Sequence, residues 1–168
     1  MNRMKHERTY DRSRKGVQLI TFRFGAEFYG INVSKVREIL RPLDLFPIPG
    51  MGTNVEGVIN LRGEIIPIVK MHALIGAGHG QDADVSPKRR MIIIEAPFGS
   101  FGFFVDEVLE VTRIQNEDVQ SAPDLGGGGP RSTVVTGLVK VSGRMVVCLD
   151  SDKLIPDDLM AKELSLGV

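Results

Sequence analysis

Apolar and polar side chains alternate over several short stretches of the chain, and this alternation predicts β-strands. Residues 18–24 place apolar side chains at every second position, which is typical of a strand with one buried face. A turn is expected at 25–27 and a second strand at 28–31, so that the two strands form a hairpin. A turn or short helix is expected at 32–36, followed by a strand at 37–40.

The clearest hairpin is expected at residues 55–69, where two apolar segments flank Arg62 and Gly63. Gly63 can supply the positive φ that a tight turn requires. Pro67 in the second strand suggests an edge position or a bulge, because proline has no backbone N–H to donate. An extended connection is expected before this hairpin, because proline fixes φ at three nearby positions, Pro42, Pro47 and Pro49.

The pattern of the first half recurs in the second half. Residues 28–39 align with 100–111, and residues 57–63 align with 137–143. The first alignment places identical residue types opposite each other: Gly30 and Gly102, Val33 and Val105, Val36 and Val108, Glu38 and Glu110. A duplicated β unit without a catalytic cluster in either copy is typical of a binding module.

The second copy is expected to follow a loop at 75–88, which is rich in Gly, Asp, Ser and Pro. A long connection at 115–129 is expected to interrupt it. Its elements are expected to be strands at 91–95 and 100–105, a turn or short helix at 106–109, a strand at 110–114, and a hairpin within 136–149 that turns at Ser142 and Gly143.

Many short strands with almost no helix indicate a barrel or a sandwich, and two copies indicate two small barrels packed on each other. Residues 1–16 are polar and basic, so we expect a disordered N-terminal arm. The main domain is expected at 17–155. In the tail at 156–168, apolar residues at loosely helical spacing predict a short C-terminal helix.

Composition favours a cytoplasmic globular protein. The chain has 168 residues, 42% of them hydrophobic, and its 21 basic residues balance 21 acidic ones, so no net charge attracts it to nucleic acid or lipid. No apolar run approaches the roughly 20 residues of a membrane span, and the N-terminus lacks the apolar core of a secretory signal. The single cysteine, Cys148, is best interpreted as a small buried hydrophobe.

No motif in the sequence favours catalysis, a metal or a cofactor. The histidines, His6, His72 and His79, have no second ligand at a metal-binding spacing. The glycine-rich runs do not connect a strand to a helix as a phosphate-binding loop does. Asp106 and Glu107 are adjacent, but neighbours in an extended segment point to opposite faces and would not converge on a substrate.

A nucleic-acid-binding β-barrel is the alternative to a protein adaptor, because such barrels present aromatic side chains beside basic ones. Phe22 and Phe24 share one face of a strand, and Phe101 and Phe103 share another. No basic stripe is interleaved with them, which favours a place in the core. Salt-dependent binding to oligonucleotides would distinguish the two functions.

The residues resemble the CheW-type chemotaxis coupling domain over about 17–155. Residues 28–39 (FYGINVSKVREI) match the first signature of that family, and Ile48-Pro49 followed by residues 55–69 (VEGVINLRGEIIPIV) matches the most specific one. Residues 102–108 (GFFVDEV) and 143–145 (GRM) complete the pattern. The arm before residue 18, the glycines at 126–129 and the segment at 71–74 depart from it.

This resemblance implies two pseudo-symmetric, five-stranded, SH3-like β-barrel lobes that share a hydrophobic core. It also implies an adaptor without catalysis, which couples chemoreceptors to the histidine kinase CheA on the inner face of the membrane. The adaptor would bind the CheW-like regulatory domain of the kinase and the cytoplasmic tip of the receptors. The resemblance assigns no kinase-contact residues here.

The resemblance further implies a receptor-binding groove between the lobes, lined by Val33, Val36, Glu38, Ile39, Asn60, Arg62, Val105 and Val108. For the four valines, an ordinary place in the core is the alternative. Arg62 lies at a turn where packing demands no charge, and its counterpart in the second copy is Ser142. The partner of Arg62 is expected to be either an acidic receptor residue or Glu38, and a solvated turn charge is the alternative.

Overall fold

The computed structural model describes residues 16–75, 86–97, 99–121 and 134–154. The arm up to residue 15, the glycines at 126–129 and the expected C-terminal helix lie outside the described residues. The first strand begins at Gly16, one residue before the start of the main domain expected at 17–155.

Strands make up most of the described chain, which confirms the all-β prediction. The elements in chain order are β1 (Gly16–Phe24), β2 (Glu27–Asn32), the 3-10 turn η1 (Val33–Lys35), β3 (Val36–Leu40), β4 (Val55–Leu61), β5 (Glu64–Val69), α2 (Met71–Ile75), β6 (Arg90–Ala96), β7 (Gly99–Val105), β8 (Glu107–Gln115), the 3-10 turn η2 (Asn116–Asp118), β9 (Val135–Val141), β10 (Arg144–Leu149) and the 3-10 turn η3 (Ser151–Lys153).

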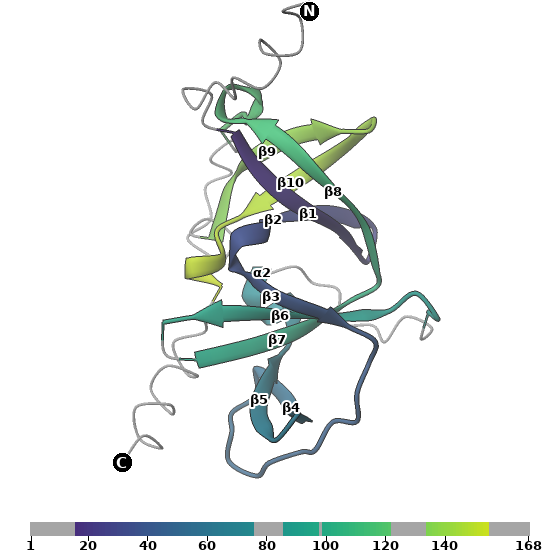
Figure 1. Ribbon diagram of the computed structural model, residues 1–168, viewed down its shortest axis with the longest axis vertical. Coiled ribbons are helices and arrows are strands. Elements are labelled where there is room, and N and C mark those ends of the chain that lie inside the picture. The colour runs from purple at the N-terminus through teal and green to yellow at the C-terminus, as the bar shows by residue number, and fades with distance from the viewer. Residues whose placement is uncertain (1–15, 76–85, 98, 122–133, 155–168) are drawn as a thin grey trace, which may run out of the picture.

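The strands form two five-stranded sheets, which make up the upper and lower parts of Figure 1. Sheet A has the order β8-β1-β2-β10-β9, and sheet B has the order β3-β6-β7-β5-β4. Replacing each strand by its counterpart in the other copy converts one order into the other, which confirms the duplication. Each sheet nevertheless combines two strands of one copy with three of the other, so the two lobes do not correspond to the two copies.

Apolar side chains form one large cluster between the two sheets and one smaller cluster among the strands of each sheet. The largest cluster takes Phe22, Tyr29 and Ile31 from sheet A and Phe101 and Phe103 from sheet B. The rings of Phe22 and Phe103 have centroids 5.8 Å apart and join the two sheets. This cluster confirms the predicted shared core, and the burial of these phenylalanines confirms that they are core residues.

The two smaller clusters are related by the same pseudo-symmetry as the strands. Within sheet B, the cluster consists of Ile59, Leu61, Ile66, Ile68, Met91, Ile93 and Phe104. Within sheet A, it consists of Leu19, Ile114, Val139, Val141, Val146 and Cys148. Cys148 is therefore the buried hydrophobe that the sequence predicts, and burial raises the pKa of its thiol to about 11.

In each sheet, a glycine allows the segment before the edge hairpin to lie against that hairpin, which is β4–β5 in sheet B and β9–β10 in sheet A. Phe46 exchanges both backbone hydrogen bonds with Val58 in β4, and Gln120 does the same with Leu138 in β9. The preceding residues, Gly57 and Gly137, lie so close to these connections that a Cβ atom would contact the carbonyl oxygen of Phe46 at 2.9 Å or that of Gln120 at 2.5 Å. Close backbone approach therefore requires glycine at both positions.

Substitution of Gly137 by alanine is expected to destabilise the protein by about 1–3 kcal/mol, because the new methyl group would collide with backbone. Gly30→Ala provides the comparison. Its Cβ would meet side-chain atoms of Leu19 and Val146, the nearest at 3.1 Å, and no backbone, so a shift of a few tenths of an ångström would relieve the contact. Urea denaturation of the two variants measures the difference, and a larger loss for Gly30→Ala would contradict the assignment.

Two local predictions are corrected by the structure. The turn or short helix expected at 106–109 is wrong, because β8 begins at Glu107 and pairs at once with β1. The edge position or bulge expected at Pro67 is also wrong, because β5 lies between β4 and β7 and the register shift between β4 and β5 is at Val55 and Gly57 instead. Val58, the partner of Pro67, directs its N–H and C=O to Phe46, so β4 needs no proline N–H. On its other side, β5 pairs with β7 through Ile68 and Gly102 and not through Pro67.

Helix α2 occupies a segment for which no helix was expected. Met71, Leu74 and Ile75 are spaced as one face of a helix and are buried in the core between the sheets. Their helical spacing was the signal, but five residues are too few for periodicity to distinguish a helix from the end of a strand.

Candidate functional site

Arg62 occupies an unusual backbone conformation at the tip of the β4–β5 hairpin. Its φ is 51° and that of Gly63 is 88°, the two positive values of a tight hairpin turn. Asn60 stabilises the turn, because its Oδ1 accepts a hydrogen bond from the N–H of Gly63 at 2.8 Å. Positive φ is uncommon for a residue other than glycine, asparagine or aspartate, so arginine is not the residue that turn geometry alone would favour.

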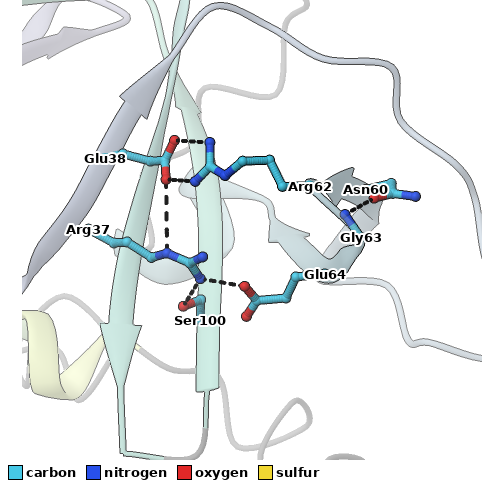
Figure 2. Close-up of polar contacts among 7 residues, drawn as sticks. All are labelled: Arg37, Glu38, Asn60, Arg62, Gly63, Glu64 and Ser100. Atoms are coloured by element: carbon cyan, nitrogen blue, oxygen red, sulfur yellow. Dashed lines mark hydrogen bonds and ion pairs between the residues drawn. The ribbon is translucent and has the colours of Figure 1, made fainter.

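The Arg62 guanidinium forms a bidentate ion pair with Glu38 of β3 (Figure 2). Its two terminal nitrogens lie 3.2 and 2.5 Å from the two carboxylate oxygens. Strand β3 is at one edge of sheet B, and the hairpin that carries Arg62 is at the other edge, so the pair joins the two edges. Of the two partners suggested by the sequence, the structure brings Glu38 to Arg62.

This contact holds both groups in their charged forms. The hydrogen bond from Arg62, supported by the positive charges of Arg62 and Arg37, lowers the pKa of Glu38. The same hydrogen bond raises the pKa of Arg62. Because the folded-state pKa of Glu38 is depressed, the contribution of the pair is present above the ordinary carboxyl pKa and is lost as pH falls through the lowered value.

A second arginine extends the contact into a network, which the sequence did not predict. Arg37 lies 2.7 Å from a carboxylate oxygen of Glu64 and donates a hydrogen bond to the Ser100 hydroxyl at 3.0 Å. Its Nε is 3.9 Å from Glu38. The signal available in the sequence was the pair of charges at the turn, with Arg62 in the two-residue turn itself and Glu64 at the start of the next strand.

The second copy has an equivalent contact, in which a serine hydroxyl takes the place of the arginine guanidinium. Ser142 and Gly143 have φ values of 50° and 79°, and the Ser142 hydroxyl donates a hydrogen bond to Glu110 at 2.8 Å. Glu110 is the counterpart of Glu38, so each lobe connects its outer hairpin to its opposite edge strand through a glutamate. Only sheet B has an arginine at this turn.

The apolar residues expected at the site divide into exposed and buried positions. Ile39 is 37% exposed and stands opposite Ile92, a residue of the core between the sheets, so it lies on the face of β3 that turns toward sheet A. Val36 and Val108 are half-buried and pack against that core, and Val33 is half-buried in η1. Val105 is 1% exposed, so its side chain is part of the core and offers no surface in this conformation.

The ion pair therefore joins Glu38, on one edge strand of sheet B, to the hairpin that carries Asn60 and Arg62 at the other edge. Ile39 follows Glu38 on β3, and its side chain lies on the opposite face of the strand. We call Glu38, Ile39, Asn60 and Arg62 the Glu38–Arg62 surface. Val36 lies on the same strand as Glu38 and Ile39 but faces the core. Val33, Val105 and Val108 belong to the two places where the chain crosses between the sheets.

Other features of the described chain offer no stronger candidate. Two open depressions of about 580 and 420 Å³ lie on sheet A, and none of the eight expected residues lines them. Within residues 16–75, 86–97, 99–121 and 134–154, no three His, Cys, Asp or Glu side chains are grouped to hold a metal ion. In the same ranges, no helix has the length and apolar character needed to cross a membrane.

Comparison with known proteins finds a matching family. The model of the CheW-like domain family matches residues 18–159, which includes both sheets and the Glu38–Arg62 surface. The chain belongs to the CheW-like family. A chemotaxis protein CheW from Treponema pallidum is 32% identical over 89% of this chain and 88% of its own length. A CheW from Rhizobium meliloti is 31% identical over 85% of this chain and 90% of its own length.

A solved CheW structure has the same fold. The scaffolding protein TtCheW from Thermoanaerobacter tengcongensis superposes with a TM-score of 0.73 at 26% identity, covering 85% of this chain and 90% of its own. Membership of a family of chemotaxis scaffolds confirms the prediction of a CheW-type protein that is not an enzyme.

Proposed function

We propose that this CheW-like protein is a chemotaxis adaptor that couples the cytoplasmic tips of chemoreceptors to a CheA-type histidine kinase. It would work on the inner face of the membrane, where receptors present those tips. The observation that carries the proposal is the Glu38–Arg62 surface, in which the ion pair fixes Glu38 on β3 directly before Ile39, an exposed isoleucine of the same strand.

The chemistry of this surface suits a helical partner. An amphipathic helix buries an apolar stripe and hydrogen-bonds through charged side chains on either side of it. Ile39 offers the apolar contact on the face of β3 that turns toward sheet A, and Glu38, next to it on the strand, is held in place by Arg62 on the other face. Side chains that are already ordered lose less entropy on binding, which favours a rigid receptor site.

Replacement of Ile39 by aspartate is expected to weaken binding of a receptor cytoplasmic fragment by about 2 kcal/mol, or roughly 30-fold. Ile39 is the sharper test than Val36, for which the same loss is expected. Val36 packs against the core, so an aspartate there could also unfold the protein. Isothermal titration with the receptor fragment measures the effect, and circular dichroism checks the fold.

Val111→Asp is the matched control, because Val111 is the counterpart of Ile39 in sheet A and is 57% exposed. We expect this variant to bind the receptor fragment as the wild type does. Equal loss in both variants would mean that the effect is not specific to the Glu38–Arg62 surface, and no loss in Ile39→Asp would contradict the proposed receptor site. Binding of the kinase regulatory domain, measured separately, should survive in Ile39→Asp.

A further inference from the structure

The two sheets are connected by the chain at two crossings within the described residues. The first runs from β2 to β3 through η1, and the second runs from β7 to β8 through Asp106. Between the sheets lie the apolar cluster that contains Phe22 and Phe103 and, at the second crossing, an ion pair from Lys88 to Glu107. Apolar packing is not directional, so it resists separation of the sheets more strongly than a change in the angle between them.

The Asp106 crossing is fastened to sheet A by directional contacts. The Asp106 carboxylate accepts a hydrogen bond from the N–H of Gly25 at 2.6 Å, in the β1–β2 turn. The N–H of Asp106 donates to the carbonyl oxygen of Arg23 at 3.0 Å. The Arg23 guanidinium donates to the carbonyl oxygen of Gly25 at 3.0 Å and lies 3.6 Å from the Asp106 carboxylate. Together these contacts hold Asp106 against the β1–β2 turn through both its side chain and its backbone.

Among the described residues, the other crossing has no comparable set of contacts. The counterpart of Asp106 is Ser34 in η1, whose N–H donates to the neighbouring Asn32 side chain at 2.9 Å. A salt bridge of 3.3 Å joins Lys35 to Asp152, but these side chains are 42% and 62% exposed. Exposed pairs of this kind contribute little, whereas the Asp106 side chain is only 23% exposed.

We propose that Asp106 is a positioning residue that fixes the angle between the two sheets and so shapes the surface that receptors contact. The effect on receptor binding rests on the function proposed above, while the effect on the sheet angle does not. Asp106 follows Val105, which is buried in the core, and precedes Val108, which packs against the core. A shift of Asp106 would therefore move core residues of both sheets. The Glu107 side chain is directed elsewhere, to Lys88 at 3.5 Å.

The test measures the distance between the sheets in the free protein. Spin labels on Glu95→Cys in β6 and Lys140→Cys in β9, both exposed, report the distance in a Cys148→Ala background by pulsed electron resonance. Asp106→Ala is expected to broaden or shift the distance distribution. Asp106→Asn keeps an acceptor for the Gly25 N–H and is expected to restore most of the wild-type distribution. Asp152→Ala, at the other crossing, is expected to leave it unchanged.

A wild-type distribution in folded Asp106→Ala would overturn the proposal, and so would equal broadening in Asp152→Ala. If Asp106→Ala fails to fold, Asp106→Ser takes its place, since serine occupies the equivalent position of the first copy. Receptor-fragment binding is the second measurement, with an expected weakening of about fivefold in Asp106→Ala and recovery in Asp106→Asn. If wild-type protein does not bind the fragment, the proposed function fails, while the distance measurement still decides the role of Asp106.

Discussion

Replacement of Arg62 by alanine is expected to leave the fold intact and to reduce receptor control of the kinase at least about tenfold. The ion pair with Glu38 is at the surface, so the melting temperature should change by less than about 2 °C. Receptor control of the kinase should be lost because, in the described residues, the Arg62 guanidinium is the only group at this turn that binds Glu38 on the opposite edge of sheet B. A reconstituted assay with receptor, kinase and adaptor measures the effect.

Two further variants separate the charge from the shape of the turn. Arg62→Lys keeps the charge without the planar fork of donors, so it should restore control only in part. Arg62→Asn suits the positive φ better and should raise the melting temperature slightly, while control remains lost. Ser142→Ala is the matched control in the other lobe. Wild-type control in the Arg62→Ala assay would show that Arg62 is only a solvated turn charge.

Replacement of Phe103 by alanine is expected to cost about 3–5 kcal/mol, a large part of the stability of a domain of this size. Phe103 is 0% exposed, and its ring contacts Phe22 across the boundary between the sheets. The substitution would remove this aromatic contact and leave a cavity that the two rigid sheets cannot close. Equilibrium unfolding in urea measures the loss.

Val111→Ala serves as the control for this variant, because it shortens an apolar side chain that is already 57% exposed. Its stability should remain within about 0.5 kcal/mol of the wild type. A loss below about 1 kcal/mol for Phe103→Ala would mean that the sheets repack easily, and the core between them would then not determine their arrangement.

The sequence predicted the strands well because period-two alternation is local, as in β1 and in the β4–β5 hairpin. It also predicted the duplication, since Gly30 and Gly102 occupy equivalent places beside β10 and β5. It could not predict the exchange of strands between copies. Alternation and turn residues are the same whether a hairpin pairs within its own copy or with the other one, so only the complete topology distinguishes the two arrangements.

The candidate site was predictable in part. Asymmetry between the copies singled out Arg62 against Ser142, and Glu38 was one of its expected partners. The sequence could not separate Val105 from Ile39, because both are apolar residues on strands, and burial depends on which sheet covers them. Arg37 reaches Glu64 and Ser100 from different strands, and such convergence follows from strand order rather than from local pattern.

The exchange of strands has a consequence for synthesis on the ribosome. Strands β1 and β2 are made well before their neighbours in sheet A, β8 and β10, which follow all the strands of sheet B in the sequence. A lone two-stranded hairpin is at best marginally stable in water. The nascent chain must therefore keep the apolar face of this hairpin from aggregating until β8 and β10 have been made, and neither copy contains all the strands of a sheet.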